Sequence, residues 1–234
     1  MKVVLSRRLQ ALADMVTLGN RVADVGCDHG FLSIYLVQNQ ISPRVLAMDV
    51  REGPLARAKE HIARCGLGSY IETRLSDGLS AYEKGEAQTL VCAGMGGRVM
   101  TKILASQEEK AKSFSELILQ PQSEIPQFRR FLQDGGYKIQ EENILCEEGK
   151  YYFMMKAVYT GQEIDNQSEL FLEFGEKLLE DRNPVLREYL EYRLKTTLEI
   201  EKELNFGEKD RAKERLCQVR QERKRLLEAL SYWE

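Results

Sequence analysis

The sequence predicts an α/β fold in two parts, a mostly parallel β-sheet closed by an antiparallel hairpin and a C-terminal helical hairpin. Strand-like and helix-like segments alternate from residue 21 to about residue 159. Such alternation is typical of a parallel sheet with helices on both faces. After a polar stretch at 161–168, strand signals end and leucines recur at helical spacing. We therefore expect one domain at 1–161 and a second, helical domain at 162–234.

The expected elements of the first domain follow in order along the chain. A helix with a serine cap opens at Leu5-Ser6-Arg7-Arg8-Leu9. Candidate strands, bounded by turn residues, are 21–27, 44–50, 70–75, 89–93 and 116–120. Helical patterns lie at 31–38, 54–65, 98–111 and 125–134. Segments 137–145 and 151–159 flank Glu147-Glu148-Gly149-Lys150, which predicts a β-hairpin.

The second domain is predicted as an antiparallel, coiled-coil-like pair of helices. Apolar residues at helical spacing are Leu186, Leu190, Leu194, Leu198 and Leu204, then Leu216, Val219, Leu226 and Leu230. Asn205-Phe206-Gly207 between them is an expected helix stop. The last helix also carries Arg215, Arg220, Arg223, Lys224 and Arg225. These cations form either a solvated face or a patch that contacts phosphates.

Composition excludes several classes of protein. Of the 234 residues, 43% are hydrophobic and 30% charged, and no apolar run approaches the roughly 20 residues of a membrane span. The charged N-terminus does not resemble a signal peptide, so we expect a cytoplasmic protein. Five scattered cysteines and two histidines predict neither a metal site nor disulfides. The net charge of −3 shows no global basicity, although a local basic patch could still bind nucleic acid.

The segment Asp24-Val25-Gly26-Cys27-Asp28-His29-Gly30 is the main candidate for a ligand site. It joins an apolar strand to an apolar helix through a glycine turn. Gly26 and Gly30 allow a ligand to approach the backbone, and the helix start offers free N–H groups. Two carboxylates in the turn disfavour a phosphate ligand. They favour one that is cationic and rich in hydroxyl and amine donors, as S-adenosyl-L-methionine is.

Further candidate cofactor-binding residues lie at the ends of the strands that follow. Because the carboxyl ends of parallel strands share one edge of a sheet, we expect these residues to lie near the glycine turn. Asp49 follows the glycine turn by about 20 residues, where a carboxylate can accept from ribose hydroxyls. Asp77 can meet an adenine amino group, although Asp77-Gly78 alone could be turn chemistry. The expected cofactor-binding residues are Asp24, Gly26, Cys27, Asp28, Gly30, Asp49, Val50, Asp77, Gly78, Ala93 and Gly94.

A nicotinamide-type dinucleotide site is disfavoured by the turn itself. That site needs glycine at the second position of G-x-G-x-x-G, which Asp28 occupies here. The segment Gly94-Met95-Gly96-Gly97 ends the fourth expected strand. At that place, methyltransferases that act on exocyclic amines of adenine or cytosine commonly carry (Asn/Asp)-Pro-Pro-(Tyr/Phe). The glycines of this segment leave space for a flat base and favour a ring nitrogen as acceptor, unless they serve only a tight turn. Met95, Gly96 and Arg98 are therefore expected to contact the substrate.

Asp28 is the candidate catalytic residue. Methylation of a neutral adenine at a ring nitrogen produces a cation, which a carboxylate can stabilise or deprotonate. Asp28 could instead serve only the cofactor. His29 is a second candidate for substrate contact, or simply the residue that begins the helix. Arg7 and Arg8 could reach a substrate phosphate or the cofactor carboxylate, or lie on an ordinary surface helix.

Taken together, these residues resemble the bacterial tRNA (adenine-N1) methyltransferases that act on position 22 of the D-loop. The resemblance rests on six segments: Leu5-Ser6-Arg7-Arg8-Leu9, Asp24–Gly30, Asp49, Asp77-Gly78, Ala93-Gly94-Met95-Gly96-Gly97 and Gln120-Pro121-Gln122. It implies a class I, Rossmann-like methyltransferase fold, S-adenosyl-L-methionine as methyl donor and tRNA as substrate. It also implies a coiled-coil appendage that helps grip the tRNA.

Two alternatives stay open at this point. The chain could methylate another RNA, a protein or a small molecule, or it could be a cofactor-binding RNA adaptor without catalysis. The intact set of Asp24, Asp49, Asp77 and the glycine turn disfavours the adaptor. We expect tRNA as partner, no membrane, no metal and a monomer.

Overall fold

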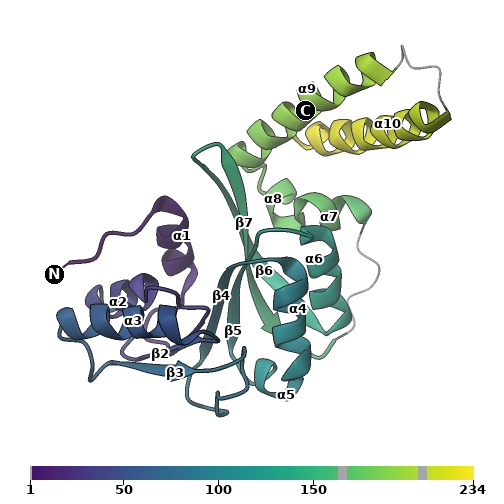
Figure 1. The fold of residues 1–234 in the computed structure, drawn as a ribbon. Helices are drawn as coiled ribbons and strands as arrows, with labels where there is room; N and C mark the ends of the chain where they lie inside the picture. Colours follow the sequence, from purple (N-terminus) through teal and green to yellow (C-terminus); the bar gives the residue numbers. More distant parts are fainter. Residues whose placement is uncertain (1, 163–167, 205–209) are drawn as a thin grey trace. The chain divides into compact units, whose positions relative to one another are not determined.

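The computed structural model describes residues 2–162, 168–204 and 210–234, and the chain divides into two compact units, 1–165 and 166–234. The expected helix stop Asn205-Phe206-Gly207 lies outside the described residues. Figure 1 labels the helices and strands of both units along the chain.

The first unit is built on a seven-stranded sheet in the order β3-β2-β1-β4-β5-β7-β6. Its strands are β1 (Val22–Val25), β2 (Val45–Asp49), β3 (Ile71–Leu75), β4 (Thr89–Met95), β5 (Glu116–Pro121), β6 (Tyr137–Glu147) and β7 (Lys150–Tyr159). The pairs among β1 to β5 are parallel, whereas β7 is antiparallel to both β5 and β6. The predicted fold, a parallel sheet closed by an antiparallel hairpin, is confirmed. The second hairpin strand, β7, is the one that joins β5.

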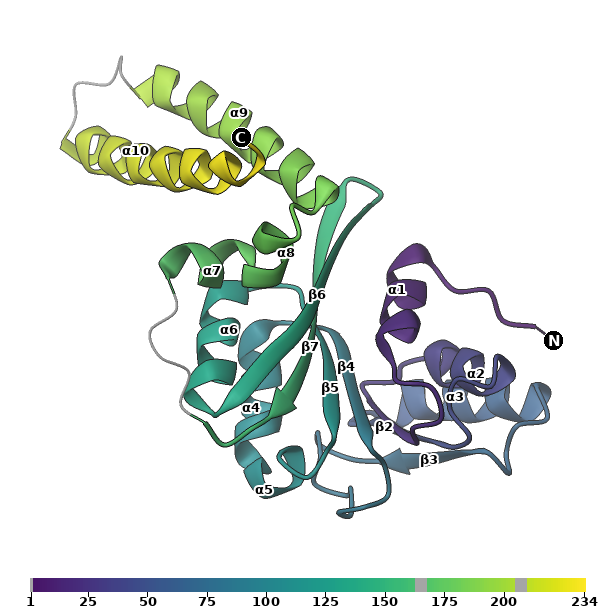
Figure 2. The ribbon, with the colours of Figure 1, turned by 180° about the vertical axis from the view of Figure 1, so that it is seen from behind.

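Helices cover the sheet on both faces (Figures 1 and 2). They are α1 (Arg7–Met15), α2 (Phe31–Gln38), α3 (Glu52–Arg64), α4 (Gly97–Ser106), α5 (Glu108–Ala111) and α6 (Ile125–Asp134). α1, α2 and α3 share one core cluster and α4, α5 and α6 share the other. The single helix expected at 98–111 is wrong, because Gln107 leaves the helical region at φ −133° and ψ 45° and separates α4 from α5.

The strands alternate between the two clusters, as side chains on a strand must. In β4, Leu90 and Cys92 pack under α4 whereas Val91 packs under α2, and all three are 0% exposed. Burial on both faces explains the near-continuous apolar runs of these strands.

Local sequence signals account for the ends of several elements. Ser6 caps α1, accepting a hydrogen bond from the Leu9 N–H at 3.3 Å. Glu148 and Gly149 have φ of 51° and 75°, the two positive values that a tight hairpin turn requires. The Arg129–Glu142 ion pair, 2.9 Å long and 1% exposed on each side, ties α6 to β6.

The second unit consists of helices in its described residues. α7 (Glu169–Phe174) and α8 (Glu176–Glu180) precede α9 (Pro184–Leu204) and α10 (Asp210–Leu230), which pack along each other as an antiparallel pair (Figure 1). A short 3₁₀ turn, Ser231–Trp233, follows. Within the described residues, none of the helices is long and apolar enough to span a membrane.

Candidate active site

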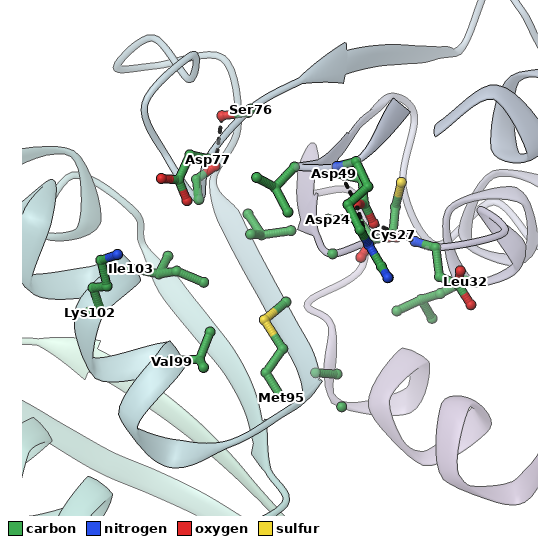
Figure 3. A pocket seen from close by; sticks show the side chains of 18 of the residues that line it. Asp24, Cys27, Leu32, Asp49, Ser76, Asp77, Met95, Val99, Lys102 and Ile103 are labelled. Carbon is green, nitrogen blue, oxygen red and sulfur yellow. Dashed lines mark hydrogen bonds and ion pairs between the residues drawn. The ribbon is translucent and has the colours of Figure 1, made fainter. Parts of the chain in front are cut away.

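A cavity of about 800 Å³ opens at the carboxyl ends of the parallel strands. It lies where the strand order reverses, because β1 pairs with β2 on one side and β4 on the other. Thirteen of the expected site residues line it: Arg8, Asp24, Gly26, Cys27, Asp28, His29, Asp49, Val50, Asp77, Gly78, Ala93, Gly94 and Met95. Figure 3 shows Asp24, Cys27 and Asp49 grouped at one side of the cavity, with Val99, Lys102 and Ile103 on the helix opposite.

The glycine turn forms the wall below Met95. The N–H groups of Gly26 and Cys27 both donate to the Met48 carbonyl, at 2.8 and 3.0 Å, which anchors the turn to β2. Gly26 has φ +79°, and a Cβ placed there would lie 2.2 Å from Met95 Cε. The turn therefore needs glycine for its backbone, and a side chain at position 26 would also displace the flexible end of Met95. Gly30, with φ +72°, caps α2 behind the cavity wall, where a Cβ would meet Ala58 at 3.1 Å.

Three carboxylates line the same cavity. Asp24 is 5% exposed and accepts from Ser33 Oγ at 2.6 Å. Burial raises its pKa to about 6, against the hydrogen bond from Ser33, and the charge of Asp49 raises it further. Asp49 is 6% exposed and accepts from the N–H groups of Arg51 and Asp28, at 2.9 and 3.3 Å. Asp77 lies beside Ser76 at the far side (Figure 3).

Asp28 holds a left-handed backbone conformation with φ +47°, which few residues other than glycine adopt. Its side chain is 58% exposed and its Oδ2 lies 3.5 Å from His29 Nε2. The His29 ring stacks on Phe31 at 5.6 Å, and Phe31 stacks on His61 at 4.9 Å. The carboxylate is thus presented at the cavity beside an ordered aromatic cluster.

The end of β4 carries a β-bulge. Its register with β5 shifts between Ala93 and Met95, and the intervening Gly94 has φ +78°. Bulges of this kind redirect side chains next to active sites. Gly96 and Arg98 lie beyond the cavity wall, where Gly96 caps α4 and Arg98 forms an ion pair with Glu124 at 2.6 Å.

The two arginines of α1 point to different places. Arg8 reaches the cavity, donates to Gln120 Oε1 at 2.8 Å and lies over the Tyr152 ring at 5.5 Å. Arg7 instead contacts the end of β6, donating its backbone N–H to Glu147 Oε1 at 2.7 Å. Only Arg8 therefore joins the other site residues.

The last helix places the predicted basic residues in a different setting. Arg220 and Arg223 both pair with Glu201 of α9, at 3.0 and 2.7 Å. Arg215 donates to Gln218 at 3.1 Å, and Lys224 is exposed. All four belong to the second unit, whereas the cavity is formed by the first.

Several lining residues are not predicted by the sequence pattern. They are Leu9, Val25, Phe31, Leu32, Arg51, Ser76, Ser80, Val99, Lys102, Ile103, Ser106, Gln107 and Gln122. Those on α4 have the pattern of an ordinary amphipathic helix, and only the packing of α4 across the strand ends brings them to the cavity. Gln122 directly follows β5, so its place at the carboxyl edge could have been inferred from the strand pattern.

The cysteines near the cavity are poor nucleophiles. Burial raises the pKa of the Cys27 thiol above its ordinary range, and the nearby charges of Asp24 and Asp49 raise it further. Burial, with the charge of Asp24, raises the pKa of Cys92 to about 12. Both thiols stay protonated near neutral pH. Among the described residues, no three His, Cys, Asp or Glu side chains form a group that could hold a metal.

Comparison with known proteins gives one family. Residues 5–155 match the family described as "Methyltransferase domain". Among curated proteins, the tRNA (adenine(22)-N(1))-methyltransferase of Bacillus subtilis strain 168 is 37% identical over 153 residues, which is 65% of this chain. The aligned region spans 64% of that relative's length.

Solved structures match over nearly the whole chain. The structure of the B. subtilis m1A22 tRNA methyltransferase TrmK has a TM-score of 0.84 and 29% identity, over 98% of this chain and all of that one. A Streptococcus pneumoniae protein, provisionally assigned as a tRNA (m1A22) methyltransferase and solved with S-adenosyl-L-methionine, has a TM-score of 0.85 and 30% identity. That match covers 97% of this chain and 100% of that chain.

Proposed function

This chain belongs to the methyltransferase domain family and, within it, to the tRNA (adenine(22)-N(1)) methyltransferases, and we propose that it transfers a methyl group from S-adenosyl-L-methionine to N1 of adenine 22 in the tRNA D-loop. One observation supports this most: the glycine turn, three carboxylates and the exposed Asp28 line a single cavity at the carboxyl edge of the sheet.

The cavity fits the methyl donor by its chemistry. The backbone of Gly26 lines the cavity, and Asp24 offers a buried carboxylate for an ammonium group. Asp49 ends β2, where its carboxylate can accept from ribose hydroxyls, while Val50 and Ile103 provide apolar surface for an adenine ring. When bound, S-adenosyl-L-methionine supplies a methyl group on a positively charged sulfur. No residue needs to act as a nucleophile, which agrees with the protonated state of Cys27 and Cys92.

Asp28 stabilises the positive charge that forms on the acceptor adenine when it is methylated. N1 of adenine carries a lone pair, and its methylation gives a cationic ring. The Asp28 carboxylate lines the cavity and can stabilise that charge or accept a proton from the N6 amino group. Its partly exposed position keeps it available to a substrate rather than only to the buried cofactor pocket.

The tRNA itself is bound through positive charge on both units. Arg8 borders the acceptor side of the cavity, and α10 carries Arg215 and Lys224 without a carboxylate partner in the described residues. Such cations position the phosphate backbone and make binding sensitive to salt. We propose further that the enzyme acts as a monomer, in the cytoplasm where tRNA is found.

The proposal is tested with donor carrying a labelled methyl group and unmodified tRNA transcripts. We expect label to enter a transcript with adenine at position 22 and not the same transcript with guanine there. Donor binding measured by calorimetry serves as the control for a folded site. Bound donor without incorporation into any tRNA would favour the RNA-adaptor alternative, and label in the guanine transcript would place the acceptor elsewhere.

A further inference from the structure

Arg8, Gly94 and Gln122 converge on one corner of the active-site cavity, and all three line it. A Cβ placed on Gly94 would lie 3.6 Å from an Arg8 guanidinium nitrogen and 3.9 Å from Gln122 Nε2. Because Gly94 has no side chain, its backbone face is bordered by a guanidinium on one side and a carboxamide on the other. Gly94 and Gln122 lie at the ends of β4 and β5, whereas Asp49 and Asp77 lie at the ends of β2 and β3 on the other side of β1, so we assign this corner to the acceptor.

Arg8 is held in place by its neighbours. Its guanidinium donates to Gln120 Oε1 at 2.8 Å and lies 5.5 Å above the Tyr152 ring. Gln120 is 0% exposed, and its Nε2 donates to the Pro121 carbonyl at 3.2 Å, so its own orientation is fixed. The guanidinium is therefore a rigid border of the corner.

Gln122 has a fixed backbone and an available side chain. Its N–H donates to the Met95 carbonyl at 2.8 Å, which fastens the residue to the bulge at the end of β4. The residue is exposed, and its carboxamide makes no hydrogen bond to any other residue in the part of the chain that the structure describes. A donor and an acceptor thus face the cavity without an internal partner.

We propose that the Gln122 carboxamide recognises the target adenine through its N6 and N7 atoms. This inference rests on the proposed function. The amide oxygen accepts from the N6 amine and the amide nitrogen donates to N7, the two-contact pairing by which glutamine distinguishes adenine. Guanine presents acceptors at both of those positions, so both contacts cannot form. Recognition on this Hoogsteen edge leaves N1, on the neighbouring Watson–Crick edge, free to be methylated.

The test removes the N7 acceptor from the substrate and the amide from the enzyme. We compare tRNA carrying adenosine or 7-deazaadenosine at position 22, with the wild type and Gln122→Ala. For the wild type, kcat/KM is expected to fall about tenfold on the deaza substrate, a loss typical of one such hydrogen bond. Gln122→Ala, which removes the contacts to both N6 and N7, is expected to lose at least as much on normal tRNA and nothing further on the deaza tRNA.

Gln107→Ala is the matched control, since it removes a second glutamine of the same cavity at the end of α4. It should keep the full deaza penalty. Donor affinity measured for each variant shows that the site is folded. A deaza penalty of equal size in Gln122→Ala and the wild type, or none in the wild type, would overturn the inference. Failure of the wild type to methylate normal tRNA would instead overturn the proposed function.

Discussion

Asp28 shows how one residue can be exposed and yet conformationally fixed. Its φ of +47° lies in the left-handed region, and its N–H donates to the buried carboxylate of Asp49 at 3.3 Å. The backbone thereby aims a charged side chain at the cavity without burying it. A carboxylate in this position can respond to charge on a substrate that enters the cavity.

Asp28→Asn separates the catalytic from the binding interpretation. Asparagine tolerates the left-handed conformation, so the turn should fold normally. We expect kcat for tRNA methylation to fall by about 10²-fold or more, because the charge that stabilises the cationic product is removed. Donor affinity measured by calorimetry should change little. A large decrease in donor affinity with normal kcat would assign Asp28 to the cofactor alone.

Gly26→Ala tests whether donor binding requires glycine at position 26 of the turn. Alanine would be strained on a backbone with φ +79°, and its Cβ, 2.2 Å from Met95 Cε, would displace the Met95 side chain. We expect donor binding to be abolished in a calorimetric titration while the protein remains folded by circular dichroism. Gly26→Ala combined with Met95→Ala should recover part of the affinity, and normal binding by Gly26→Ala would contradict this description of the turn.

Donor affinity should depend on the ionisation of Asp24. Burial raises the pKa of its carboxyl from 3.8 to about 6, so below pH 6 the free protein holds a proton there. A cationic ligand must displace that proton, and its Kd is expected to rise by up to about tenfold per pH unit below 6. The same shift means that ionisation of Asp24 lowers folding stability as pH rises from 3.8 towards 6. Calorimetry from about pH 4.5 to about pH 7 measures the affinity.

Asp24→Asn is the control for that profile. It should bind the donor more weakly and show no break near pH 6. A donor Kd that does not change with pH in the wild type would contradict the proposal that the Asp24 carboxylate binds the donor ammonium group.

Whether a site residue can be predicted from the sequence depends on whether a strand end or the packing of a helix places it in the cavity. Asp24 and Asp49 lie at the ends of β1 and β2, Asp77 lies just beyond β3, and strand ends in a parallel sheet converge by topology. Val99, Lys102 and Ile103 arrive through the packing of α4, which no local pattern specifies. Arg7 and Arg8 are adjacent in sequence, yet only the helix orientation sends Arg8 to the cavity and Arg7 to β6.

At the scale of elements, α10 divides its basic residues into two groups. Arg220 and Arg223 bind the buried carboxylate of Glu201 and so fasten α10 to α9. Arg215 and Lys224 have no such partner in the described residues and remain available for phosphates. The basic sequence pattern alone could not show which of these cations pair with Glu201.

Paired substitutions should distinguish the two groups. Replacing Arg215 and Lys224 with alanine is expected to weaken tRNA binding and to reduce its salt slope by about 1 for each phosphate that is no longer neutralised, with an unchanged melting temperature. Replacing Arg220 and Arg223 should lower the melting temperature, because Glu201 would then be buried without them. Fluorescence anisotropy over a salt series and thermal melting measure both effects. Unchanged tRNA affinity and salt slope in the first pair would contradict phosphate binding by Arg215 and Lys224.

Helices and strands of the first unit were largely predictable because apolar segments alternate with glycine, proline and polar turn residues along the chain. The limits 31–38 and 125–134 agree with α2 and α6 to the residue. The break at Gln107 was not predicted, because a single polar residue gives no local signal for it. The helices α7 and α8 were not predicted either, because they are too short to show a helical period, although Ser168 caps α7 and Gly175 separates the two. Hairpin formation was evident from Gly149, whereas the pairing of β7 rather than β6 with β5 depends on the whole sheet.

At the scale of the molecule, the chain joins a catalytic unit to a separate helical unit. The family match covers residues 5–155, all within the first unit, and the cavity is formed there alone. We therefore assign donor binding and methyl transfer to the first unit, and we propose that the second unit contributes to tRNA binding. A net charge of −3 does not oppose this proposal, because binding of a polyanion depends on local groups of cations rather than on the total charge.

Methylation of a ring nitrogen of adenine 22 is tested most directly by nucleoside mass spectrometry of the reacted tRNA. Wild-type protein, donor and unmodified tRNA are incubated, and the methylated nucleoside is identified and mapped to its position. We expect 1-methyladenosine at position 22, strongly reduced with Asp28→Asn. N6-methyladenosine, or methylation only at another position, would contradict the proposed function.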